Sequence, residues 1–204
     1  VLGVPFIEFL APGLIAMQVI QQAFSHSSSS LLMGKVMGNI IDLIGAPLSS
    51  GEVTLSIIFA SITRGAIISL TSIITFSLII EIEVNNYFIL LIYLFLSSFL
   101  MGAVGIIAGL WADKFDNMAT VTNFLIVPLS FLSGTFYSIE RLPNILNILS
   151  SYNPFFYMID GFRYSFIEEM DGSIEFGIIY LSTLSIFVWL VAYYMYKKGY
   201  KIKS

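Results

Sequence analysis

The sequence has 204 residues, of which 57% are hydrophobic and only 11% are charged, and its mean hydropathy is +0.91. Because an ordinary soluble domain carries about 25% charged residues, this composition excludes a water-soluble globular protein. The lack of cysteine also excludes a disulfide framework and a thiolate metal site. The net charge of -4 is less informative than the positions of the individual basic residues.

Five apolar runs are long enough to cross a bilayer, which takes about 20 apolar residues in a helix. They lie at residues 3–25, 53–80, 87–111, 118–138 and 175–196. The first run holds only one charged residue, Glu8, the second only Arg64, and the third none. The sequence therefore predicts an all-α, polytopic transmembrane helical bundle that forms a single domain over residues 1–204.

The segment that connects the first two runs, residues 34–46, is amphipathic but too short to cross. Its apolar and polar residues occupy opposite helical faces: Val36, Met37, Ile40, Ile41 and Ile44 against Lys35, Asn39 and Asp42. Pro47 would end this helix. We predict an interfacial helix, which either binds a soluble partner or lies on the lipid headgroups. The serines at 25 and 27–30 are expected to soften the end of the preceding span.

Arg64 is the most unusual residue of the spans, because a guanidinium about twelve residues into a transmembrane helix costs ~2.5 kcal/mol or more. At ~1.5 Å of rise per residue, Glu8 is expected at a similar depth in the preceding span. We hypothesise that Glu8 and Arg64 form an ion pair between neighbouring helices. The alternatives are that Arg64 lines a translocation pathway or contacts another subunit.

Residues 134–172 are expected to contain two short helices, at 142–151 and 155–169, separated at Asn153 and Pro154. Neither helix is long enough to span, so we expect a re-entrant or surface-lying hairpin on the outer side. Tyrosine and phenylalanine are concentrated in this segment. That concentration is typical of an aromatic belt at the headgroup level and would also suit a gate over a pathway.

The basic residues indicate how the bundle is oriented in the membrane. With a cytoplasmic C-terminus, six lysines fall on the inner side: Lys35, Lys114, Lys197, Lys198, Lys201 and Lys203. Only Arg141 and Arg163 then lie outside. In this orientation the first run begins on the outer side, which predicts that one further span precedes Val1.

Residues suited to catalysis are scarce in this sequence. His26 is the only histidine, which excludes a multi-histidine metal site, and no G-x-x-x-x-G-K-[ST] phosphate loop occurs. We therefore expect neither an enzyme activity nor a cofactor in this chain, so that any ATP hydrolysis would belong to another polypeptide. The expected surroundings are the lipid bilayer and protein partners, not nucleic acid.

Four stretches together resemble the type-2 ATP-binding-cassette permeases, the bacterial export subunits for drugs, polysaccharides and lipid-linked molecules. They are FLAPGLIAM at 9–17, SSSSLLMGKVMGNIIDLIGAPLSSGE at 27–52, NFLIVPLSFLSGTFYSIERLP at 123–143 and NPFFYMIDGFRYSF at 153–166. In this order, with the predicted spans between them, the resemblance covers nearly the whole chain.

The resemblance implies a half-transporter with six spans, five of them within this sequence, in the bacterial inner membrane. Two copies would form the pathway between them. The segment at residues 34–46 would be the cytoplasmic coupling helix, in which Lys35, Asn39 and Asp42 would contact a separate ATPase that carries ATP and Mg²⁺.

By the same resemblance, the segment at 134–172 would be an outer re-entrant hairpin, with the break before it at Pro128, Ser133 and Gly134. The implied function is the permease subunit of an ATP-driven exporter. One alternative is an ion-coupled secondary transporter, which should show internal repeats and more ionisable groups within the membrane. Another is a membrane-embedded enzyme or scaffold.

Overall fold

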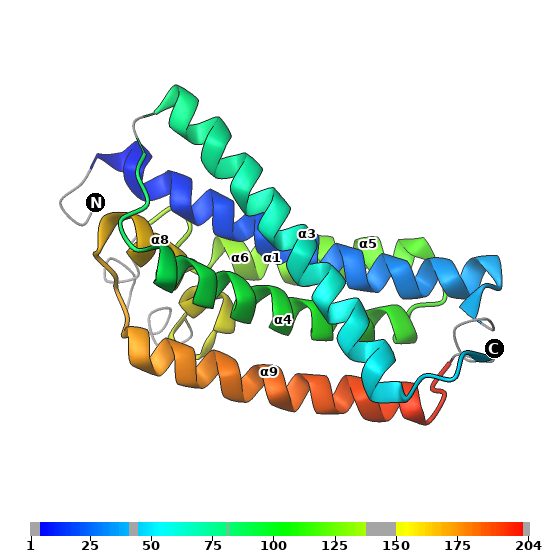
Figure 1. The fold of residues 1–204 in the computed structure, drawn as a ribbon. Helices are drawn as coiled ribbons and strands as arrows, with labels where there is room; N and C mark the ends of the chain where they lie inside the picture. The colour runs from blue at the N-terminus through cyan, green and yellow to red at the C-terminus, as the bar shows by residue number, and fades with distance from the viewer. Residues whose placement is uncertain (1–4, 41–44, 81, 138–149, 202–204) are drawn as a thin grey trace.

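The computed structural model describes residues 5–40, 45–80, 82–137 and 150–201, and the regular elements within these ranges are helices. They are α1 (Phe6–Met37), α3 (Ser50–Ile79), α4 (Tyr87–Trp111), α5 (Phe115–Val121), the π-helical η1 (Thr122–Ile126), α6 (Val127–Phe131), α8 (Pro154–Ile167) and α9 (Ile174–Lys197). Figure 1 shows the long helices running between two ends of the bundle, with the C-terminus at the end where α1 stops.

Four helices in the described ranges are long and apolar enough to cross a membrane: α1, α3, α4 and α9. They confirm the predicted helical runs at 3–25, 53–80, 87–111 and 175–196. The first of them is longer than predicted, because α1 has 32 residues and continues to Met37. α4 lies at the centre, packed against α1, α3, α8 and α9.

The fifth predicted span, at 118–138, corresponds to an uninterrupted helical stretch that contains a π-helical turn and ends earlier than predicted. It consists of the consecutive segments α5, η1 and α6, which have 7, 5 and 5 residues and end at Phe131. Pro128 has no N–H for the carbonyl of Phe124, and its ring would crowd that carbonyl in a regular α-helix. The wider turn of η1, in which the Val127 N–H bonds to the Thr122 carbonyl, lies directly before this proline.

Close contact between α1 and α4 depends on small residues. A Cβ atom on Gly105 of α4 would lie 2.6 Å from the carbonyl oxygen of Phe24, and one on Gly109 would lie 2.7 Å from that of Ser28. The Ser28 hydroxyl donates to the Phe24 carbonyl at 2.8 Å, so it needs no partner outside its own helix. Small residues that let two helical backbones approach are typical of helix pairs in membranes.

The serines at 25 and 27–30 therefore lie inside a continuous helix, and the expectation that they soften the end of a span was wrong. The hydroxyls of residues 27–30 bond back to carbonyls three or four residues earlier, which preserves the helix in an apolar setting.

The predicted interfacial helix at 34–46 begins inside α1. Gly38, with φ of 78°, ends α1 in the left-handed conformation that glycine adopts readily. Residues 41–44, which include Asp42, lie outside the described residues. α3 then begins with a capping box, in which Ser49 and Glu52 bond each other's backbone N–H groups. The boundaries 34–46 were thus wrong at their start, because residues 34–37 extend the preceding span.

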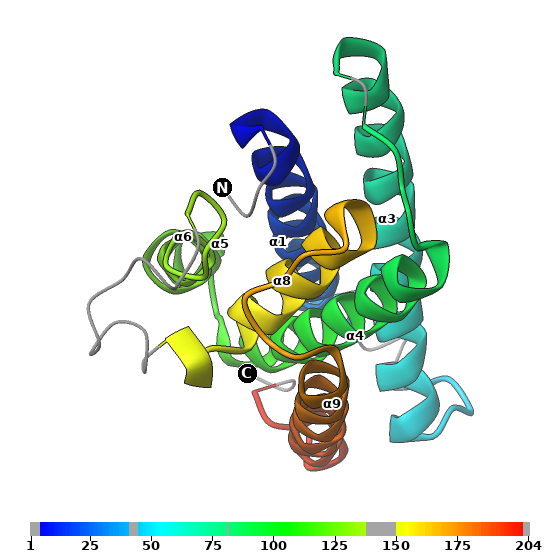
Figure 2. The ribbon, with the colours of Figure 1, turned by 90° about the vertical axis from the view of Figure 1, so that its left-hand side faces the viewer.

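At the other end of the bundle, α8 confirms the predicted helix at 155–169 with slightly different bounds. The Asn153 side chain accepts the N–H of Phe155, and Pro154 occupies the first turn, where no N–H is required. Figure 2 shows α8 close to α1, α4 and the start of α9, and most of its residues are buried. The predicted helix at 142–151 falls mainly outside the described residues.

Candidate functional site

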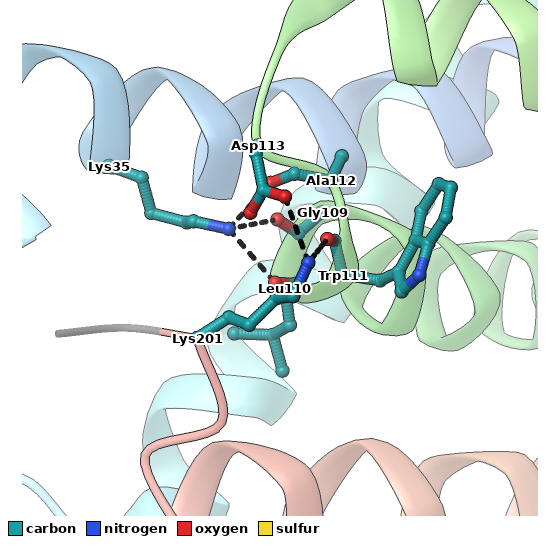
Figure 3. Close-up of polar contacts among 7 residues, drawn as sticks. All are labelled: Lys35, Gly109, Leu110, Trp111, Ala112, Asp113 and Lys201. Atoms are coloured by element: carbon teal, nitrogen blue, oxygen red, sulfur yellow. Dashed lines mark hydrogen bonds and ion pairs between the residues drawn. The ribbon is translucent and has the colours of Figure 1, made fainter. Parts of the chain in front are cut away.

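The C-terminal end of α4 is held by lysines from two other parts of the chain. α4 ends at Trp111 without a basic residue in its own last turn, so its final carbonyls need other donors. Lys35, in the last turn of α1, donates from Nζ to the carbonyl oxygens of Leu110 at 2.9 Å and Ala112 at 2.6 Å. A third, longer bond reaches Gly109 at 3.4 Å, as Figure 3 shows.

Lys201, beyond the end of α9, completes this arrangement. Its Nζ donates to the Trp111 carbonyl at 3.1 Å and to Oδ2 of Asp113 at 2.8 Å. The hydrogen bond from Lys201 lowers the pKa of Asp113, and the same bond raises the pKa of Lys201. We call Lys35, Lys201 and Asp113 the lysine cluster. It attaches the end of α1 and the C-terminal tail to the end of α4 (Figure 3).

The three residues predicted to contact the ATPase differ in their surroundings. Lys35 is half-buried and bound to α4, Asn39 is exposed just after α1, and Asp42 lies outside the described residues. A shallow groove near Asn39 is lined by Ser29, Ser30, Met33, Gly34, Met37 and Asn39. The lysine ends of α1 and α9 and the end of α4 thus share one side of the bundle (Figure 1).

A buried ion pair occupies the opposite end. Arg163 of α8 is fully buried and donates from Nη2 to the Gly134 carbonyl at 2.7 Å and from Nε to the Phe9 carbonyl at 3.5 Å. Its guanidinium carbon lies 3.8 Å from the centre of the Phe9 ring. Asp160, one turn earlier, lies 3.7 Å from Nη1 of Arg163.

The Asp160 carboxylate also fixes the loop before α9, because it accepts the backbone N–H groups of Asp171 at 3.1 Å and Gly172 at 2.8 Å. Burial raises the pKa of Asp160 to about 6, whereas these two bonds and the charge of Arg163 act to lower it. We call Asp160 and Arg163 the buried pair. It joins α8 to α1, to the turn at Gly134 and to the start of α9.

The residues predicted at the breaks before and within the hairpin are partly brought together. Asn153 donates from Nδ2 to the Ser133 hydroxyl at 2.8 Å and to the Leu129 carbonyl at 3.3 Å. Gly134 has φ of 77°, and its carbonyl accepts the bond from Arg163. Pro154 begins α8, whereas Pro128 is exposed in α6 and stands apart from this network.

The predicted pair of Glu8 and Arg64 is not formed. Arg64 donates from Nη2 to Oε1 of Gln22 at 2.8 Å, and Glu8 lies in the first turn of α1, about four turns before Gln22. The prediction took the inner end of α1 to be near residue 25. Because α1 continues to Met37, the residue opposite Arg64 lies further along the chain.

Comparison with known proteins decides the family. The sequence profile of the ABC-2 type transporters matches residues 1–167, which extend from α1 through α8. The chain belongs to the ABC-2 type transporter family. Proteins named inner membrane transport permease YadH, from Escherichia coli K12, Escherichia coli O157:H7 and Shigella flexneri, are each 28% identical over 204 residues. The alignments cover 99% of this chain and 79% of each relative.

As an ABC-2 type transporter, the chain is a membrane permease, and the resemblance inferred from its sequence is confirmed. Within the described ranges, no three histidine or acidic side chains come close enough to hold a metal ion. The sites described above consist of hydrogen bonds and salt bridges within and between parts of the chain.

Sequence reasoning missed the buried pair, the partners of the lysine cluster and Gln22. A signal for the first was present, because Asp160 and Arg163 are opposite charges three residues apart in an otherwise apolar helix. The count of basic residues had placed Arg163 on the outer side of the membrane and did not predict that it is buried. Lys201 and Asp113 are 88 residues apart, and no local pattern predicts that they meet.

Proposed function

We propose that this chain is the permease subunit of an ATP-driven exporter in the bacterial inner membrane. Two copies would form the pathway, and a separate cytoplasmic ATPase would bind ATP and Mg²⁺. The observation that carries the proposal is the family match over residues 1–167. The inner membrane location rests on the similarity to proteins named inner membrane transport permeases.

The distribution of basic residues supports a cytoplasmic C-terminus. Lysines from α1, α9 and the segment after α4 collect at one end of the bundle, and the membrane insertion machinery retains such positively charged ends on the inner side. The buried pair would then lie toward the outer side. Its guanidinium is fully covered by protein, so it does not count as an exposed positive loop.

The lysine cluster supplies a mechanical route from the ATPase into the bundle. The connection between α1 and α3, residues 38–49, would receive the push of the ATPase when ATP closes it. Because Lys35 binds the last carbonyls of α4, a displacement of the end of α1 would move α4 with it. The helices would thus shift as a rigid group, one of the established ways in which switching proteins move.

The outer end would respond as a second rigid unit. α8 is joined through the buried pair to α1 and to the start of α9, so tilting of these two helices would displace α8 and the hairpin that it belongs to. In this proposal α8 closes the outer mouth of the pathway in one state and leaves it in the other.

Co-purification tests the proposal most directly. The full-length protein, tagged and extracted from its native membrane in mild detergent, should retain a polypeptide with an ATP-binding cassette and a vanadate-sensitive ATPase activity. Substitution of the phosphate-loop lysine in that partner should abolish both hydrolysis and export. Transport by the purified permease alone on an ion gradient would instead support a secondary transporter and overturn the proposal.

A further inference from the structure

Most of the outward-facing surface of the spans is apolar, as contact with lipid requires. On α3, Leu78 and Ile79 are 83% and 75% exposed, and on α9 Phe187 is 63% exposed. The exposed residues of α5, η1 and α6 include Phe124 and Leu125. These surfaces need no partner other than acyl chains.

One face of α1 departs from this pattern over its middle turns. Gln18, Gln22, Ser25 and Ser29 follow each other at intervals of four, three and four residues, which places them on one side of the helix. Gln18 and Ser25 are exposed, whereas Gln22 and Ser29 are half-buried. We call these four residues the polar stripe. The apolar side chains between them, such as Val19 and Ile20, are fully buried against the bundle.

Arg64 adds a positive charge to the polar stripe. It is exposed, and its bond to Gln22 is its one side-chain hydrogen bond within the described residues. Arg64 lies near the middle of α3 and Gln22 near the middle of α1, each roughly 20 Å from the helix ends at ~1.5 Å per residue. The guanidinium is therefore too deep to reach the headgroups by extending its side chain.

Acidic residues do not balance this charge in the described parts of the chain. Those in the four long helices are Glu8, Glu52 and Glu175, and all three lie in the first turn of their helix. Arg64 has five N–H donors in a planar group suited to two oxygens at once, and Gln22 occupies only one of them. A charge of this kind at mid-depth requires water or an anionic partner.

We propose that the polar stripe and Arg64 form part of the wall of the transport pathway, where Arg64 binds an oxyanion group of the transported molecule. The inference rests on the proposed function and narrows its substrates to molecules that carry a carboxylate, phosphate or sulfate. Gln22 acts as a positioning residue, because its amide oxygen holds the guanidinium against α1. The stripe supplies further polar groups on both sides of that position.

The absence of cysteine from the sequence allows a direct test in the assembled transporter in native membranes. Single cysteines replace Gln18, Ser25 and Ser29 in the polar stripe, and Leu70 and Ile186 as exposed apolar controls in α3 and α9. Each variant is treated with two membrane-impermeant methanethiosulfonate reagents of similar size, one with a sulfonate group and one with a trimethylammonium group. The rate of modification is measured for each reagent.

We expect both reagents to modify the stripe cysteines and neither to modify the controls. At Ser25→Cys the sulfonate reagent should be favoured over the ammonium reagent by on the order of tenfold relative to a free thiol, as for a unit charge a few ångströms away. Arg64→Gln should remove this preference, and Arg64→Lys should preserve it. If Arg64→Gln does not accumulate, high salt should reduce the preference in the unchanged background.

Stripe cysteines that resist both reagents would overturn the pathway assignment, because the stripe would then face lipid or be covered by protein. A preference that Arg64→Gln leaves unchanged would overturn the oxyanion site. Co-purification of the ATPase is measured on the same membranes. The ATP-driven function and the oxyanion site can therefore fail independently.

Discussion

At both ends of the bundle, basic side chains donate hydrogen bonds to backbone carbonyls, but the side chains are much more deeply buried at one end than at the other. At one end Lys35 and Lys201 satisfy the last carbonyls of α4, and at the other Arg163 satisfies the carbonyls of Gly134 and Phe9. Lys35 is half-buried and Lys201 makes its contacts at the surface, whereas Arg163 is fully buried. Water can replace the lysines if they leave, but nothing can replace Arg163.

This difference teaches where the molecule can change shape. A lysine amine lies at the end of a flexible side chain and exchanges hydrogen-bond partners readily. A buried guanidinium is planar and rigid, so it would lose several hydrogen bonds at once if it moved. The lysine cluster can adjust its contacts during transport while it keeps the ends of α1 and α4 coupled. The buried pair is suited to keeping α8, α1 and the start of α9 together throughout.

Removal of Arg163 should have the largest effect. Arg163→Met leaves Asp160 buried without its cation and should lower the free energy of unfolding by about 3–5 kcal/mol, measured by thermal denaturation in detergent. The double variant with Asp160→Asn removes the unpaired charge and should recover part of this loss. A single variant as stable as the parent protein would show that the two ends do not differ in this way.

Close packing between α1 and α4 connects the two ends, and Gly105→Ala should disturb it. The added methyl group would meet the Phe24 carbonyl at 2.6 Å, and such overpacking costs about 1–3 kcal/mol. Gly45→Ala is the matched control, since an added Cβ atom there would meet no atom of another part of the chain within 4 Å and its φ needs no glycine. The melting temperatures of the two variants should differ clearly, and equal values would contradict the close contact.

The features that could be predicted from the sequence are those set by local pattern. The apolar runs gave four long helices, and Asn153 with Pro154 marked the start of α8. The length of α1 could not be predicted, because a run of serines usually indicates the end of a span. In the structure these serines bond to carbonyls of their own helix and pack against Gly105 and Gly109 of α4. Because α1 was predicted too short, Glu8 was predicted as the partner of Arg64 in place of Gln22.

The functional contacts were harder to predict because they join distant parts of the chain. Lys35 was predicted to contact the ATPase because of its polar position, and its contact with α4 was not foreseen, since its amine binds carbonyls 74 to 77 residues away. Burial of Arg163 depends on Phe9, 154 residues earlier. A single sequence contains no signal for such long-range pairs, although opposite charges within an apolar helix mark candidates.

The lysine cluster should respond to substitution in function more than in stability. Lys35→Met removes a cation near the C-terminus of α4, which is worth only about 0.3–1 kcal/mol in a partly exposed setting. Under the proposed function, ATP hydrolysis by the partner should continue while transport falls, because α4 no longer follows α1. Lys35→Arg should retain most of the transport. Equal loss of hydrolysis and transport would indicate a failure to bind the ATPase instead.

A change of pH should also distinguish the two ends of the bundle, and we expect this effect to be the smallest of those considered. Because the pKa of Asp160 is about 6 in the folded protein and lies near 4 in an unfolded chain, unfolding at pH 5 releases a proton. The contribution of Asp160 to stability is therefore full below pH 4 and is lost as the pH rises through 6. Relative to Asp160→Asn, the unsubstituted protein should gain stability between pH 7 and pH 5.

The lysine cluster should behave oppositely in this range. The pKa of Asp113 is lowered and that of Lys201 is raised, so their contribution falls only below the usual carboxylate range or above the usual lysine range. Lys201→Met should thus leave the pH dependence between 5 and 7 unchanged. The opposite result would be a loss of stability of the unsubstituted protein, relative to Asp160→Asn, when the pH falls from 7 to 5. In that case the hydrogen bonds to the Asp160 carboxylate would outweigh the effect of burial, and Asp160 would respond to pH as Asp113 does.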